Sequence, residues 1–282
     1  MLRVLRWLRN VVAGAVLLAI ATYLVIYVLS ERVLRRTYPL PHVTLSIPTD
    51  TGSIQLGERL AHVHGCVGSC HGKSGQGAVM FDDPKVARIV APNLTQAVRR
   101  YSDGQIVAIV RYGRRPDGSS VFVMPSQAFN VLTDADLGAI IAFLKTLPLS
   151  AGPTLATTLG PLGRIGLALG KLKTADVLVA QIVAPPTADN PQAQFGRYLA
   201  RSICSECHGT NLRGDSNPAF TSPNLAIVRA YSLDVFKDLL VRGTALGDRQ
   251  LPTMTSTARE RLAYLTEDEI SALYAYLHTV TP

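Results

Sequence analysis

The longest apolar stretch of the chain lies at its start. Residues 11–30 carry no charge, and Arg3, Arg6 and Arg9 precede them. Twenty such residues are enough to cross the hydrocarbon core of a bilayer as a helix. A cleaved signal peptide is the alternative, but its apolar core spans only about 7–15 residues. The pattern therefore predicts an uncleaved membrane anchor over residues 1–36, with its helix at about 11–30.

Two later segments place apolar residues at helical spacing, which predicts a helix with one face in a core. The two faces consist of Leu137, Ile140, Ile141 and Leu144, and of Ile270, Leu273, Tyr274 and Leu277. Thr133 with Asp136 opens the first segment and Thr266 with Glu269 opens the second, which is capping-box spacing. The two helices are therefore expected to be equivalent.

These helices close an internal repeat that covers residues 55–148 and 193–282. Short sequences recur in the same order, such as GERL and GRYL, SCHG and ECHG, and PNL in both halves. Between its cysteines and its final helix, each half is rich in Gly and Pro and has few strand signals. We expect two small, mainly helical domains with long loops, each with a thin core that a large buried cofactor would complete.

Two further segments link these parts. Residues 37–54 contain three prolines and predict an extended tether that lifts the first domain off the bilayer. Residues 149–192 form a connector in which residues 162–183 can be helical. We expect the connector to pack between the two domains; docking onto a partner subunit or the membrane surface is the alternative.

The net charge does not indicate a nucleic-acid partner. The formal charge is +8, but residues 1–36 alone hold six arginines and one glutamate. The remaining surface is mildly basic and has no cluster of Lys and Arg, so nucleic-acid binding is not expected.

The four cysteines of the chain fall into two pairs, each directly followed by a histidine. Cys204 and Cys207 precede His208 in CSECH, the spacing at which two thiols attach to a haem while the adjacent histidine binds its iron. A zinc site or a redox CxxC site is the alternative. Zinc needs two more ligands, and none follows. The motif therefore predicts covalently bound haem.

The first cysteine pair has one residue more than this pattern. Val67, Gly68 and Ser69 separate Cys66 from Cys70, which precedes His71. The extra residue lies upstream of Cys70 and His71, and glycines next to Cys66 let the segment bulge. We therefore expect a second covalent haem with thioether bonds to both cysteines. Attachment by Cys70 alone is the alternative.

Methionines are candidates for the remaining position on each iron. Met124 and Met254 occupy equivalent places before the two final helices, and the chain has only four methionines. Ordinary core packing is the alternative. Met80, His62 and His64 have no counterparts in the other repeat; we expect Met80 to be a loop or packing residue and the histidines to face solvent.

With these motifs, each repeat resembles a class I cytochrome c domain. The whole chain resembles the membrane-anchored dihaem c-type cytochromes that transfer electrons for bacterial periplasmic dehydrogenases and terminal oxidases. The iron ligands that the resemblance implies are His71 with Met124 and His208 with Met254. It also implies that the backbone carbonyls of Pro92 and Pro223 accept the Nδ1 hydrogen of these histidines.

Ligation by His and Met leaves no iron position open for a substrate, which is typical of an electron carrier. We therefore expect a non-enzymatic, mainly α protein with two haem c groups, tethered to the bacterial inner membrane with its haem domains in the periplasm. Its partners would be redox proteins or subunits of a membrane complex. A dihaem peroxidase or sulfur-compound dehydrogenase is the alternative; a sensor would need an output domain, which the sequence does not show.

Overall fold

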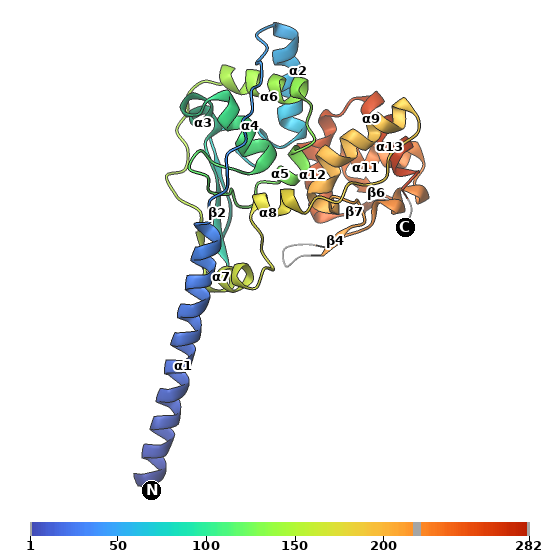
Figure 1. Cartoon of the computed structure of the whole chain (residues 1–282). Helices are drawn as coiled ribbons and strands as arrows, with labels where there is room; N and C mark the ends of the chain where they lie inside the picture. Colours follow the sequence, from blue (N-terminus) through green and yellow to red (C-terminus); the bar gives the residue numbers. More distant parts are fainter. Residues whose placement is uncertain (1, 217–220, 281–282) are drawn as a thin grey trace.

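The computed structural model describes residues 2–216 and 221–280. A long N-terminal helix carries two compact, mainly helical domains that lie side by side at one end of it (Figure 1). This helix, α1 (Leu2–Leu34), is long and apolar enough to span a membrane, and its most apolar part is not covered by the rest of the chain. The expected fold class is therefore confirmed. Residues 1 and 281–282, at the ends of the expected anchor and second domain, lie outside the described residues.

The first domain consists of five helices and a β-hairpin. These elements are α2 (Thr51–Val63), β1 (Ala78–Asp83), β2 (Ala87–Ala91), α3 (Leu94–Arg100), α4 (Asp103–Tyr112), α5 (Ser126–Phe129) and α6 (Asp134–Thr146). Helix α2 crosses the final helix α6 so closely that a Cβ atom on Gly57 would lie 1.9 Å from the carbonyl oxygen of Ala139. The apolar face predicted for α6 is buried in the core.

The second domain repeats this plan. Its helical elements are α9 (Pro191–Leu199), the π-helical turn η1 (Ala200–Cys204), α10 (Ser205–His208), the 3₁₀ helices η2 (Leu225–Ala230) and η3 (Leu262–Tyr264), α11 (Leu233–Arg242), α12 (Pro252–Glu260) and α13 (Glu267–Leu277). Two short strand pairs join them, namely β4 (Asp215–Ser216) with β5 (Thr221–Ser222) and β6 (Thr244–Ala245) with β7 (Arg249–Gln250). A Cβ atom on Gly196 would lie 1.9 Å from the carbonyl oxygen of Ala272, so α9 crosses α13 as α2 crosses α6.

The two final helices are capped differently. In α13 the Thr266 hydroxyl accepts from the Glu269 amide at 3.2 Å, and the Glu269 carboxylate accepts from the Thr266 amide at 2.8 Å. This is the predicted capping box. In α6 the Thr133 hydroxyl accepts from the Asp136 amide at 3.0 Å, but the Asp136 carboxylate accepts from the Tyr198 hydroxyl of the second domain instead. The capping box expected at α6 is therefore only half formed.

The β-hairpin of the first domain was not expected from the sequence. Strands β1 and β2 pair in antiparallel fashion, and β3 (Thr158–Leu159) from the connector adds a third strand beside β2. Alternate residues of β2 are buried, and Asp83 caps the tight turn by accepting from the Lys85 amide at 2.8 Å. Met80 lies on β1 with 46% of its surface exposed, so it is neither a loop residue nor packed in the core.

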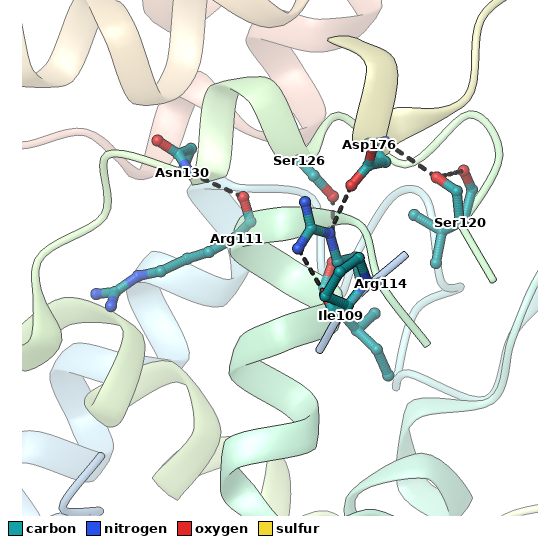
Figure 2. Close-up of polar contacts among 9 residues, drawn as sticks. Ile109, Arg111, Arg114, Ser120, Ser126, Asn130 and Asp176 are labelled. Atoms are coloured by element: carbon teal, nitrogen blue, oxygen red, sulfur yellow. Dashed lines mark hydrogen bonds and ion pairs between the residues drawn. The ribbon is translucent and has the colours of Figure 1, made fainter. Parts of the chain in front are cut away.

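The connector forms two short helices in place of the longer helix expected over residues 162–183. Helix α7 (Pro161–Ala168) is followed by Gly170 in the left-handed conformation (φ 68°), which separates it from α8 (Ala175–Ala180). Figure 2 shows Asp176 of α8 facing Arg114, to which it is joined by an ion pair of 2.5 Å. Both helices thus lie against α1 or the first domain. The end of the connector reaches the second domain, because the Val183 amide donates to the Thr210 hydroxyl at 3.1 Å and the Pro186 carbonyl accepts from the Tyr276 hydroxyl at 2.9 Å. The connector therefore contacts both domains.

The tether runs along the surface of the first domain. The Tyr38 amide donates to the carbonyl of Gly118 at 2.9 Å, and apolar side chains farther along, from Val43 to Ile47, pack on the domain core. Helix α2 already begins at Thr51, where Asp50 caps it. The segment is extended, as expected, but it does not separate the first domain from α1 (Figure 1), because its apolar side chains contribute to the core.

Candidate functional site

The first cysteine motif forms a bulged turn directly after α2. Gly65 and Gly68 both adopt left-handed backbone conformations, with φ of 70° and 80°. The Cys70 amide donates to the carbonyl of Gly65 at 3.2 Å, and the Gly68 amide donates to the carbonyl of Gly72 at 3.0 Å. These bonds close the turn around three intervening residues, so the longer motif is accommodated by glycine geometry, as its sequence suggested.

The turn formed by the longer motif meets the second domain at Gly68, where an added Cβ atom would lie 3.8 Å from the carbonyl oxygen of Glu260. A Cβ atom on Gly68 would lie 2.8 Å from Nδ1 of His62, so no side chain fits at this position without a shift of that ring. The neighbouring Ser69 hydroxyl donates to the carboxylate of Glu260, from α12, at 3.2 Å. The bulge therefore contributes to the contact between the two domains.

The second cysteine motif lies on a continuous helical segment. Cys204 ends the π-helical turn η1, and Cys207 and His208 lie on α10. Burial raises the pKa of Cys204 to about 12 and that of Cys207 to about 11, and it raises the pKa of Cys66 to about 12. Reactive CxxC thiols have lowered pKa values. The four cysteines form no disulfide in the structure, and these raised pKa values do not favour a reactive dithiol.

Each motif histidine is held by a backbone carbonyl. Nδ1 of His71 lies 2.8 Å from the carbonyl oxygen of Pro92, and Nδ1 of His208 lies 2.9 Å from that of Pro223. Since a carbonyl only accepts, Nδ1 carries the proton and donates it, which leaves Nε2 free to bind a metal. Burial also lowers the pKa of both histidines, which favours the neutral ring that ligation requires.

The same local structure supports both carbonyls. Pro92 follows β2, and the next residue, Asn93, caps α3 by accepting from the Gln96 amide at 3.2 Å. In the second domain Asn224 follows Pro223 and accepts from the Ala226 amide at 2.9 Å. The shared sequence PNL therefore places an acceptor for histidine and a helix start side by side.

The two candidate methionines are half-buried against the cores of their own domains. Met124 and Cys66 pack on the core of the first domain, and Met254 and Cys204 pack on that of the second. Met124 lies in a loop next to α4. The hydroxyl of Ser126, two residues later, donates to the carbonyl of Ile109 on α4 at 3.1 Å (Figure 2). Met254 lies on helix α12. Each domain thus brings a thioether and its first cysteine to one apolar cluster.

The two histidines expected to face solvent do not. His64 is only 5% exposed, packs edge-on against Phe129 and has no partner for Nδ1. His62 stacks on Tyr264 of the second domain, with ring centroids 4.2 Å apart. Both expectations are corrected, because the end of α2 and the residue that follows it are covered by Phe129 and by the second domain, which the repeat alone does not reveal.

Sequence reasoning also missed a buried cation between the two cysteine motifs. Arg261 is 6% exposed and pairs with Glu206, the residue between Ser205 and Cys207, at 2.7 Å. Its position just after α12 carries no motif. A basic residue directly before the short 3₁₀ turn η3 is too weak a signal to identify it.

The donor set fits two covalently attached haems. Each domain supplies two thiols, one histidine with Nε2 free and one thioether, which are the groups that bind the vinyl carbons and the iron of haem c. Within residues 2–216 and 221–280, no group of three or more His, Cys, Asp or Glu side chains is placed to hold a metal ion directly. The arrangement therefore does not favour the zinc alternative.

Comparison with known proteins agrees with this assignment. The family model described as Cytochrome c matches residues 54–148 and 193–281. The chain is 27% identical over 257 residues to the fructose dehydrogenase cytochrome subunit of Gluconobacter japonicus, covering 81% of this chain and 52% of that protein. It is 24% identical over 265 residues to the gluconate 2-dehydrogenase cytochrome c subunit of Pantoea cypripedii, covering 80% and 59%. The chain thus spans little more than half the length of these relatives.

Proposed function

Since the chain belongs to the cytochrome c family, we propose that it is a membrane-tethered electron carrier with one covalent haem c in each domain. It would pass single electrons from a periplasmic or quinol-side donor to a respiratory acceptor. The observation that carries the proposal is the duplicated site: in both domains a motif histidine donates Nδ1–H to a proline carbonyl, beside two half-buried cysteines.

The residues of each site would divide the work as follows. His71 and His208 bind iron through Nε2, while the Pro92 and Pro223 carbonyls fix the ring orientation and increase its basicity. Haem held in this way supplies a one-electron couple whose potential rises when the sixth ligand is a thioether. Met124 and Met254, which pack on the apolar cores of their domains, would provide that thioether and leave no position for substrate.

This geometry favours a carrier over an enzyme. A dihaem peroxidase or sulfur-compound dehydrogenase needs one iron with a displaceable sixth ligand. Here both candidate methionines are packed against the core of their domain, which favours a fixed ligand at each iron.

Membrane tethering is supported by how α1 meets the rest of the protein. Arg164 of α7 pairs with Glu31 at 2.9 Å, donates to the Ser30 hydroxyl at 2.8 Å and lies 4.0 Å from the centre of the Tyr27 ring. These contacts hold the connector helix α7 at the end of the uncharged stretch 11–30. We therefore place α1 across the bacterial inner membrane, with both haem domains on the periplasmic side.

The relatives suggest the kind of partner. Both are cytochrome subunits of sugar or sugar-acid dehydrogenases. By analogy, this chain would accept electrons from the catalytic subunit of a periplasmic dehydrogenase and deliver them to the respiratory chain.

The test is the haem content of the full-length protein in mild detergent. Iron analysis and the pyridine haemochrome assay are expected to agree on two haems per chain, and His71→Ala or His208→Ala should each disturb one of them. A single haem in the unmodified protein would contradict the proposal. Proteins that copurify with the chain would then identify the donor or acceptor.

A further inference from the structure

The two domains meet through a contact that repeats itself. Arg59 of α2 donates to the Glu269 carboxylate at 2.7 and 3.0 Å. Tyr198 of α9 donates its hydroxyl to the Asp136 carboxylate. Arg59 and Tyr198 are the third residues of GERL and GRYL, and Asp136 and Glu269 are the equivalent acids of the two final helices. Each domain therefore offers the same patch to the other, as in a two-fold symmetric interface.

This contact places the two cysteine motifs on facing surfaces. The Ser69–Glu260 bond comes from within the first motif. On the other side, α10 of the second motif contacts α5 of the first domain. The interface is therefore part of both haem sites as well as a link between two domains.

Arg261 lies between the motifs. Its Nε donates to the carbonyl of Val63 at 3.1 Å, three residues before Cys66, and its Nη2 donates to Glu206 inside the second motif at 2.7 Å. A Cβ atom on Gly65 would lie 3.2 Å from its Nε. The guanidinium thus binds a backbone carbonyl just before the first motif and a charged side chain within the second.

A buried charge between the two motifs changes the electrostatic potential at both of them. An arginine cannot discharge by losing its proton, and in a low-dielectric surrounding its field is weakly screened. A positive charge favours the addition of an electron to a nearby redox centre, and the carboxylate of Glu206 opposes this. Arg261 lies five residues before the capping residue Thr266. The residue five places before Thr133 in the first domain is Ala128, which is fully buried and uncharged.

We propose that Arg261 is a positioning residue shared by the two haem sites, which fixes the two cysteine motifs against each other and whose charge favours the reduced state of both. The proposal rests on the two-haem function proposed above. The proposal predicts that the reduction potentials of both haems change when a charge is removed, in a direction set by the sign of that charge. A purely structural role would not have this effect.

The test compares four variants of the full-length protein in detergent by spectroscopic redox titration. Arg261→Gln removes the cation, Glu206→Gln removes the anion, and Arg261→Lys retains a cation. Arg259→Gln is the control, because Arg259 lies two residues away but is exposed and, among the described residues, binds the Arg242 carbonyl and Gln250. Haem content is measured first in each.

We expect Arg261→Gln to lower both potentials and Glu206→Gln to raise them. A unit charge about 12 Å from a redox centre, at an effective dielectric constant of about 20, changes the equilibrium constant for reduction by about tenfold. The potentials of Arg261→Lys should lie much closer to those of the unmodified protein than the potentials of Arg261→Gln do. Arg259→Gln should leave both potentials unchanged. If Arg261→Gln fails to fold, the rise in Glu206→Gln alone decides the matter.

Three results would overturn the role of Arg261: unmoved potentials, a shift at one haem only, or shifts of the same sign in Arg261→Gln and Glu206→Gln. Each of these presupposes that the unmodified protein carries two haems. A single haem there would contradict the proposed function itself, and with it the sharing of Arg261.

Discussion

Replacing Gly57 with alanine is expected to destabilise the first domain strongly. Gly57 lies on α2 where it crosses α6, and the added methyl carbon would lie 1.9 Å from the carbonyl oxygen of Ala139 and 2.4 Å from its carbon. Ordinary contacts between carbon and oxygen are about 3.3–3.6 Å. The added carbon is bonded directly to the backbone of α2, and the atoms that it meets belong to the backbone of α6. A side-chain rotation therefore cannot relieve the clash. The helices must move apart by more than about 1 Å.

The cost follows from what these helices bury. A gap of about 0.5–1 Å forfeits a quarter to a half of the dispersion energy of the atoms involved, and Leu60, Val63 and Ile141 all pack in this region with less than a tenth of their surface exposed. We estimate a cost of about 3–4 kcal/mol, at or above the upper end of the range for overpacked cores. Alanine recovers about 1 kcal/mol in helix propensity. The net loss of about 2–3 kcal/mol lowers the Tm of a domain of this size by about 10–20 °C.

The assay is thermal unfolding of the full-length protein followed by circular dichroism. Gly52→Ala is the matched control, because Gly52 lies in the same helix, is exposed, and its added carbon would meet only the Asp50 carboxylate, at 3.4 Å. Gly196→Ala should have the same effect on the second domain. A Gly57→Ala protein as stable as Gly52→Ala would refute the reasoning about helix contact.

Four other predictions concern the haem sites, the anchor and acid stability. Met124→Ala or Met254→Ala should make one haem high-spin or water-ligated and halve the sulfur-to-iron charge-transfer band; an unchanged spectrum would exclude that methionine as a ligand. Cys66 should resist alkylation in the denatured protein, as mass spectrometry will show, and a labelled Cys66 would mean attachment by one thioether. Arg164→Gln should lower hydrogen-exchange protection in α7 by about tenfold through loss of its charged hydrogen bonds, without affecting α13. Burial lowers the pKa of His64 to about 3, so at falling pH this histidine is protonated in the unfolded chain before it is protonated in the folded one. The free energy of unfolding therefore decreases as the pH drops from about 6.5 to about 3. His64→Gln should flatten this pH dependence, as measured by urea unfolding.

The parts of the fold that depend on local sequence could be predicted. The spacing of Leu137, Ile140 and Ile141 indicated a buried helix face, and the structure buries all three. The capping threonines and the long apolar helix were likewise visible, because caps and helix periodicity involve neighbours within a few residues. The roles of the candidate ligands stay predictions.

The parts that depend on contacts between distant segments could not be predicted. His64 is buried because Phe129 and the second domain cover it, and no pattern around residue 64 signals this. The hairpin of β1 and β2 is stabilised by pairing with a connector strand from residues 158–159. Asp136 has the sequence of a capping residue, but its carboxylate bonds to Tyr198, which is 62 residues away in sequence.

The self-complementary contact between the domains also bears on how such a protein can diverge. Two identical subunits that met through this patch would form a homodimer, and every substitution at the interface would occur twice. An arginine between the motifs would then face its own copy across the axis, and the two like charges would repel each other. Once both copies belong to one polypeptide, Arg261 can be present on one side while Ala128 stays on the other. Fusion therefore makes possible a single, unrepeated charge at the centre of a symmetric contact, where it can act on both proposed haem sites without repulsion from its own copy.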